Sequence, residues 1–152
     1  MSTPPPKPFV QTACVCEKVL VESDGVPSLI RIVDTYTVEL PMELPPGYKT
    51  ATDLTVFVSL KSGDVVGEHE IGLRLNGPDG KARPVRRWPV RLNGQEHGAN
   101  VRIAFTLTSP EYGLYWFDVL WGDEVLTRVP FRLKAKTPAA PSGEPTEMEP
   151  RQ

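Results

Sequence analysis

The chain has 152 residues, of which 39% are hydrophobic and 24% are charged, and its formal net charge is −2. This length suits one domain with a single core, and the composition excludes both a membrane protein and a wholly disordered chain. The N-terminus lacks the basic start and the apolar stretch of a secretory signal, so we expect a cytoplasmic protein with no membrane contact.

Prolines gather at both ends of the chain. Four of the 17 prolines lie within residues 1–8 and four more lie after Thr137, where the sequence is also acidic. Proline lacks a backbone donor, and segments with few apolar side chains cannot offset the entropy of ordering. We therefore predict a disordered proline-rich leader over 1–8, one domain over 9–136 and a disordered proline-rich acidic tail over 137–152.

Between these ends, hydrophobic and polar residues alternate with the period of a β-strand, as in 54–60 and 101–107. Turn dipeptides such as Asp24-Gly25, Asn93-Gly94 and Gly122-Asp123 separate the alternating runs. Several short strands with this spacing indicate an all-β sandwich or barrel. We place the strands at 9–22, 28–39, 53–60, 67–76, 84–92, 99–108, 113–121 and 125–135.

The stretch from Glu111 to Phe117 has the order acid, any residue, glycine, any residue, tyrosine. It resembles the tyrosine corner of immunoglobulin-like domains, in which the tyrosine hydroxyl bonds back to the backbone. Phe117 stands where antibody domains carry their second cysteine, so no disulfide joins the sheets. We predict an immunoglobulin-like, two-sheet antiparallel sandwich of seven to eight strands. Strand parity points two sets of side chains inward: Tyr115, Phe117, Val119 and Trp121, and Val125, Val129, Phe131 and Leu133.

A wider likeness covers about residues 9–135. Its markers are Ala13–Leu20, Asp24–Val26, Ser28–Asp34, Gly67–Ile71, Pro78–Gly80 and Tyr112–Phe117. With these markers the chain resembles a family of small bacterial proteins known as a domain of unknown function. The resemblance implies a bacterial β-sandwich, and it brings no activity, cofactor or catalytic residue to carry over.

Cys14 and Cys16 are the only cysteines, and His69 and His97 are the only histidines. Two thiols on one strand face could bind zinc with both histidines, but structural zinc sites usually place two residues between paired cysteines. We expect free thiols that pack the core, with no metal, no cofactor and no catalytic residue. A ligand-binding or enzymatic site in the loop around His97, with Glu96, is the alternative.

Residues 81–91 form a basic segment that contains one tryptophan, Trp88. Basic residues with an interleaved aromatic can bind single-stranded nucleic acid. The low net charge provides no supporting field, and Pro84 and Pro89 suggest an edge strand protected by charge. Nucleic-acid binding is therefore the weaker alternative.

Three large apolar residues, Phe57, Trp116 and Leu120, have the parity of an outward face. Exposed apolar side chains from neighbouring strands would form a partner-binding patch. We therefore expect a non-enzymatic module that binds a protein partner or itself. Its predicted surface comprises Phe57, Trp116, Leu120, Arg86, Arg87 and Trp88.

Overall fold

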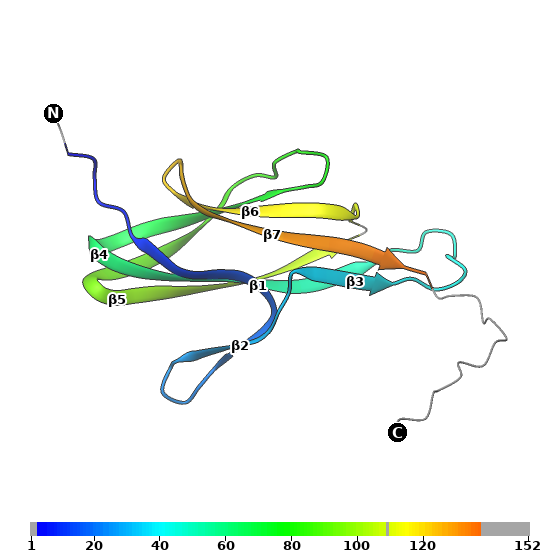
Figure 1. Ribbon diagram of the computed structural model, residues 1–152, viewed down its shortest axis with the longest axis horizontal. Coiled ribbons are helices and arrows are strands. Elements are labelled where there is room, and N and C mark those ends of the chain that lie inside the picture. The colour runs from blue at the N-terminus through cyan, green and yellow to red at the C-terminus, as the bar shows by residue number, and fades with distance from the viewer. Residues whose placement is uncertain (1–2, 109, 138–152) are drawn as a thin grey trace, which may run out of the picture.

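The computed structural model describes residues 3–108 and 110–137, which form strands and loops and no helix (Figure 1). The strands are β1 (Phe9–Val21), β2 (Pro27–Ile32), β3 (Thr35–Glu39), β4 (Ala51–Asn76), β5 (Arg86–Thr108), β6 (Gly113–Trp121) and β7 (Glu124–Lys136). The prediction of an all-β, immunoglobulin-like sandwich is confirmed.

Two layers share the long strands β4 and β5. One layer has the order β2–β1–β4–β5, using the first half of β4 and the second half of β5. The other uses the remaining halves, in the order β5–β4–β6–β7–β3. The ladder between β4 and β5 runs from the Ala51–Thr108 pair to the Leu73–Arg86 pair, with register shifts around Gly63 where both strands change layer. The strands predicted at 53–60 and 67–76 are therefore one continuous strand, β4, and those predicted at 84–92 and 99–108 are one continuous strand, β5.

The predicted strand at 28–39 is in fact two strands in different layers. The Val33 amide donates to the carbonyl of Val15 in β1, whereas the Asp34 carbonyl accepts from the amide of Arg132 in β7. The chain thus crosses between layers at 33–34. After the crossing, β3 pairs with β7 in parallel, and the remaining pairs are antiparallel.

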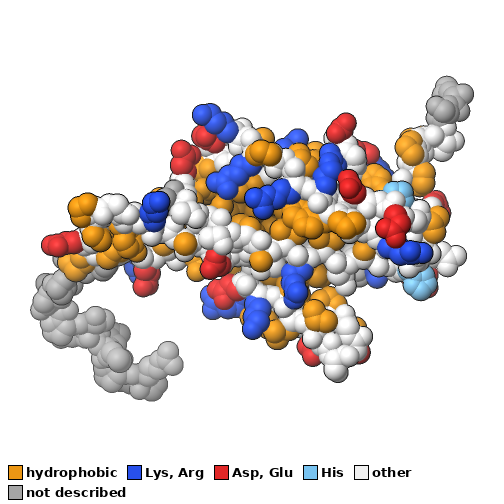
Figure 2. Space-filling model, turned by 180° about the vertical axis from the view of Figure 1, so that it is seen from behind, with side chains coloured by type: hydrophobic (Ala, Val, Ile, Leu, Met, Phe, Trp, Pro, Cys, Tyr) orange, Lys and Arg blue, Asp and Glu red, His pale blue; other side chains and the backbone are white. Residues whose placement is uncertain are grey.

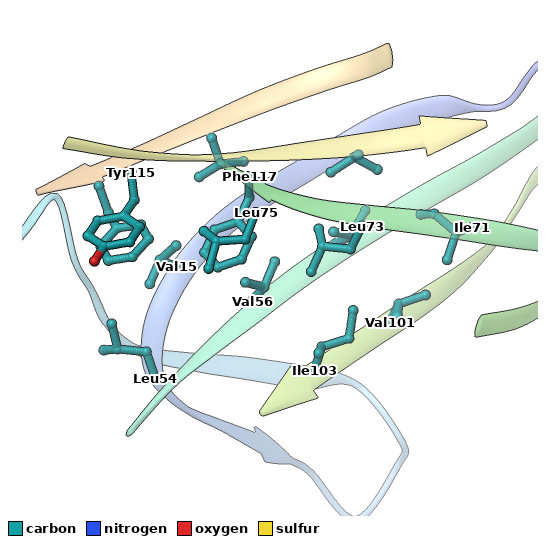
Figure 3. Packing of buried hydrophobic residues seen from close by; sticks show 14 of the residues in the cluster. Val15, Leu54, Val56, Ile71, Leu73, Leu75, Val101, Ile103, Tyr115 and Phe117 are labelled. Carbon is teal, nitrogen blue, oxygen red and sulfur yellow. The ribbon is translucent and has the colours of Figure 1, made fainter. Parts of the chain in front are cut away.

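The core lies between the two layers and contains aromatic stacks (Figure 3). Tyr115 and Phe117 of β6 stack on Phe131 of β7 with ring centroids 5.1 and 5.5 Å away. Branched aliphatic residues from the other layer, including Val56 and Ile103, complete the packing. This alternation of inward apolar and outward polar residues is the reason that the sequence forms strands here.

The tyrosine corner has the predicted geometry. The Tyr115 hydroxyl donates to the carbonyl of Glu111 at 2.5 Å. Gly113 has φ 143°, and a Cβ atom there would lie 2.9 Å from Cβ of Pro78. Glycine is therefore required both by the backbone conformation and by the close approach of the 77–85 loop.

Val125, which we predicted to face inward, is exposed. The register between β6 and β7 shifts after the Val119–Thr127 pair, so that Leu120 pairs with Val125. This bulge reverses the parity of the residues next to the turn, because one extra residue exchanges the two faces of a strand. Beyond the bulge, Val129, Phe131 and Leu133 are buried as predicted.

The predicted leader has no helix or strand over residues 3–8, but it contacts the sandwich. Pro8 is buried, and Lys7 forms an ion pair with Glu124 at 2.5 Å. The predicted tail lies outside the described residues from position 138 onward. Within the described ranges, no helix has the length and apolar character needed to cross a membrane.

Candidate functional site

Phe57 lies on the outer face of its layer, as parity predicts, but it is only 4% exposed. It packs with Cys14, Cys16 and Val19, and the half-buried Leu29 completes this cluster. The prediction that Phe57 belongs to an exposed surface is therefore wrong, because the hairpin of β1 and β2 supplies a cover.

The cover depends on an irregularity in that hairpin. Arg31 has a left-handed backbone, with φ 54°, and its side chain pairs with Glu17 at 3.0 Å. Beyond this pair, odd-numbered Val19 and Leu29 join the face of even-numbered Cys14, which strict alternation forbids. Alternation thus breaks in both strands at the position of Glu17 and Arg31, where the backbone of Arg31 is left-handed.

Leu120 is also buried, at 2% exposure, although it too has the outward parity. Val85 and Arg87 approach the same face, because a Cβ atom on Gly72 would lie 3.2 Å from Leu120 Cβ and Val85 Cγ1 and 3.3 Å from Arg87 Nη1. The predicted exposure of Leu120 is wrong for this reason. The segment before β5 folds over the outer face of its own layer.

Trp116 is half-buried beneath Arg128, whose guanidinium carbon lies 4.6 Å from the ring centroid. The outer face around Trp116 is therefore occupied by a cation–π pair. Phe57 and Trp116 lie on the outer faces of different layers, so the predicted apolar patch does not exist.

Asp118 is a buried carboxylate on the same face as Trp116. Its Oδ2 accepts hydrogen bonds from Arg74 Nε and Nη2 and from Asn76 Nδ2, and its Oδ1 accepts one from Arg128 Nε at 2.8 Å. Burial raises the pKa of Asp118, but the hydrogen bonds from Arg128, Arg74 and Asn76 outweigh burial and hold this pKa below its usual value. Every close partner of the carboxylate is a donor from a neighbouring strand, so this network joins β4, β6 and β7.

The basic segment is divided between two faces. Arg87 donates to the carbonyl of Gly122 at 3.4 Å, and Arg91 pairs with Glu68 at 3.2 Å. Arg86 and Trp88 instead line a cavity between the layers. The segment thus supplies no single row of unpaired cations.

The cysteines and histidines do not come together as metal ligands; residues 3–108 and 110–137 contain no group of three or more potential ligands. Both thiols are free and buried. Burial, with a smaller effect from Cys16, raises the pKa of Cys14 to about 11. His69 Nε2 lies 2.9 Å from the carbonyl of Val66, and exposed His97 lies 3.8 Å from Glu96.

The most distinctive surface is the outer part of the β1–β2 hairpin, which projects from the sandwich (Figure 1). Among the described residues, thirteen large hydrophobic side chains are exposed, and five of them lie in this hairpin, between 39 and 62% exposed. Such clustering differs from the scattered apolar exposure of ordinary surfaces. We call this set the hairpin patch; it extends over both faces of the hairpin, because adjacent strand residues such as Leu20 and Val21 point to opposite sides. Its members are Leu20, Val21, Val26, Ile30 and Ile32.

Sequence reasoning missed the hairpin patch, although one signal was present. Val19, Leu20 and Val21 are consecutive apolar residues, so both faces of β1 are apolar where alternation would make one face polar. A strand that is apolar on both faces needs packing partners on both sides. In the folded chain Val19 packs in the cluster around Phe57, whereas Leu20 and Val21 remain exposed.

The fold and this surface define a small immunoglobulin-like β-sandwich with a projecting apolar hairpin. The chain belongs to a family described as a family of unknown function (DUF6941), whose model matches residues 11–134. No curated protein matches the chain.

Solved structures are similar at low identity. An immunoglobulin-like protein from Pseudomonas aeruginosa is 18% identical with a TM-score of 0.39, and the match covers 85% of this chain and 98% of that one. The CARDB domain of a Pyrococcus furiosus protein, solved in complex with di-metal ions, is 16% identical with a TM-score of 0.39, over 84% and 94% of the two chains. A β-glucosidase from Kluyveromyces marxianus is 19% identical with a TM-score of 0.44 over 63% of this chain, which spans only 14% of that enzyme.

Proposed function

We propose that this protein is a non-enzymatic interaction module, and that the hairpin patch binds a protein partner. The observation that carries the proposal is the concentration of exposed apolar side chains on one projecting hairpin. Apolar surface of this kind is the usual centre of a protein–protein interface.

Contacts within the chain order the hairpin at its base and at its tip. At its base, Val19 and Leu29 pack in the cluster around Phe57. At its tip, the Val26 amide donates to the Asp24 carboxylate at 3.0 Å, and the Glu22 amide donates to the Val26 carbonyl at 2.9 Å. Such pre-ordering reduces the entropy lost on binding.

Polar pairs flank the patch at its base and near its tip. The ion pair between Glu17 and Arg31 lies at its base, and the Ser28 hydroxyl donates to Glu22 Oε1 at 2.8 Å near its tip. An apolar centre with a polar rim is typical of partner-binding surfaces.

The expected occupant is a different protein rather than a second copy of this chain. Strand β2 lies at the edge of its layer, but it has only six residues, and Arg31 breaks its regular backbone. Two copies joined edge to edge would therefore form few ladder hydrogen bonds. Contact through the apolar side chains does not need a regular edge.

The absence of catalysis is part of the proposal. A thiol must ionise to act as a nucleophile, and both Cys14 and Cys16 are buried with a raised pKa. The two histidines lie against Val66 and Glu96 rather than beside either thiol.

The test is an affinity capture with matched variants, read by quantitative mass spectrometry. The variant Ile30→Ser/Ile32→Ser removes apolar surface from the hairpin patch, and Val66→Ser/Val125→Ser removes a comparable exposed surface elsewhere. We expect a protein that is captured by the wild type and by the control variant, and lost with the hairpin variant. A partner retained by the hairpin variant would contradict the proposal, as would concentration-dependent self-association that depends on Ile30 and Ile32.

A further inference from the structure

A cavity lies between the two layers on the side where β5 forms the margin of both. One wall comes from Ile103–Leu107 at the end of β5, and the other includes Arg86 and Trp88 at its start. Its volume is about 580 Å³, within the range of roughly 300–1,000 Å³ that small-molecule sites occupy. Figure 2 shows this side of the molecule, with a band of hydrophobic side chains across its middle and Lys and Arg side chains over the band.

The cavity is lined by aromatic and aliphatic side chains together with polar ones such as Thr55 and Thr106. Phe105 is only half-buried although it faces the core, and its ring meets Phe117 edge-on at 4.9 Å. Trp88 is likewise half-buried while packing against the core. Both aromatic side chains line the cavity. The aliphatic lining is Leu54, Leu73, Leu75, Ile103 and Leu107.

The mouth of the cavity carries free positive charge. Arg83 and Arg86 line it and are exposed, and their guanidinium groups make no hydrogen bond or ion pair within the described residues. Two acids also lie at the mouth: Glu17 is paired with Arg31 at 3.0 Å, whereas Asp53 accepts only from the neutral Thr106 hydroxyl at 2.5 Å and keeps its charge. Arg83 and Arg86 outnumber this one unpaired carboxylate, so the net charge of the mouth is positive.

We propose that this cavity binds an amphiphilic carboxylate, with the apolar chain between the layers and the carboxylate at Arg83 and Arg86. Guanidinium groups match the two oxygens of a carboxylate, and an apolar chain would cover Trp88 and Phe105 without presenting unpaired polar groups. The proposal concerns a different surface from the hairpin patch and does not depend on it.

The test uses the full chain and isothermal titration with decanoate below its micelle concentration. We expect saturable one-to-one binding, with chemical-shift changes at the Trp88 indole N–H that place the ligand in the cavity. Decanol, which has the same chain and no charge, should bind at least about tenfold more weakly, since a charge-assisted hydrogen bond is lost.

Matched variants distinguish a specific contribution of Arg83 and Arg86 to ligand affinity from a general effect of positive charge. Arg83→Gln/Arg86→Gln should weaken decanoate binding at least about tenfold and leave decanol binding unchanged. Arg87→Gln/Arg91→Gln removes the same charge from the same segment outside the cavity and should leave both affinities unchanged. No saturable binding, equal affinity for decanoate and decanol, or equal losses in both double variants would overturn the proposal.

Discussion

Asp118 Oδ1 accepts a hydrogen bond from Arg128 Nε at 2.8 Å, and the same guanidinium lies over Trp116. Asp118 is only 3% exposed, so its charge depends on donors from the protein rather than on water. This arrangement fixes how β6 and β7 are joined on their outer face, and it leads to the first two predictions.

Replacing Asp118 with asparagine should lower the free energy of unfolding by about 2–4 kcal/mol, because charge-assisted hydrogen bonds are lost while Arg74 and Arg128 remain. The measurement is urea unfolding at pH 7. Asp53→Asn is the control, since Asp53 is an exposed carboxylate with one hydroxyl partner. Equal effects of the two substitutions would show that burial of Asp118 is not the cause.

Stability should fall in acid because the pKa of Asp118 is lower in the folded protein than its unfolded value of 3.8. A depressed pKa gives stabilisation that is complete above the unfolded value and is lost as the pH falls through the folded value. Urea midpoints measured from pH 6 down to pH 2 should therefore decline more steeply for the wild type than for Asp118→Asn. Parallel curves would contradict this assignment.

Removing the hydroxyl of Tyr115 should cost about 1 kcal/mol, the usual net value of one hydrogen bond. Tyr115→Phe keeps the stacking on Phe131 and loses only the bond to the Glu111 carbonyl. Tyr112→Phe, at an exposed tyrosine nearby, is the matched control and should be neutral. Both are measured by denaturant unfolding, and equal midpoints for the two variants would show that the corner bond contributes nothing.

The thiols should be almost inert in the folded protein. With its pKa at about 11, roughly one Cys14 thiol in a thousand is ionised at pH 8, and the thiolate is the reactive form. A disulfide exchange reagent should therefore react slowly with the native chain and label two thiols rapidly in guanidinium. Rapid labelling of the native chain at the unfolded rate would contradict the buried placement of Cys14 and Cys16.

Gly98→Ala should prevent folding or lower the free energy of unfolding by more than about 3 kcal/mol. A Cβ atom at this position would overlap the carbonyl oxygen of Leu60, where β4 and β5 change layer. Asn100→Ala, at an exposed position two residues further along β5, should stay within about 0.5 kcal/mol of the wild type. A stable Gly98→Ala variant would show that the bend is not fixed by this contact.

Much of the fold could be predicted because the residues that alternation marks as inward-facing are, in most strands, the residues that the folded chain buries. Tyr115 and Phe117 combine alternation with a glycine at the start of β6, and both are buried as expected. The crossing of the chain at 33–34 could not be predicted, because it depends on pairing between β3 and β7, which are distant in sequence. Alternation describes one strand and says nothing of its neighbours.

The predicted surface failed for a related reason. Parity placed Phe57 and Leu120 on outer faces correctly, but it could not reveal that Leu29 and Val85 come to those faces from other segments. The bulge before Val125 likewise depends on cross-strand register rather than on composition. The consecutive apolar residues of β1 give part of the hairpin patch in the sequence, whereas its members in β2 and the arginines at the cavity mouth are located only when the pairing of the strands is known.

The sharing of β4 and β5 between the two layers has a consequence for the order of assembly. Their hairpin joins segments that are neighbours in the sequence, so it closes at little entropic cost and forms the edge strand β5 and its neighbour β4 of both layers together. The parallel pair of β3 and β7 joins strands that are far apart in the sequence, and among the strand ladders it carries the greatest closure cost. We expect folding to begin at that hairpin, and β3 to be the last strand to attach and the first to exchange its amide hydrogens.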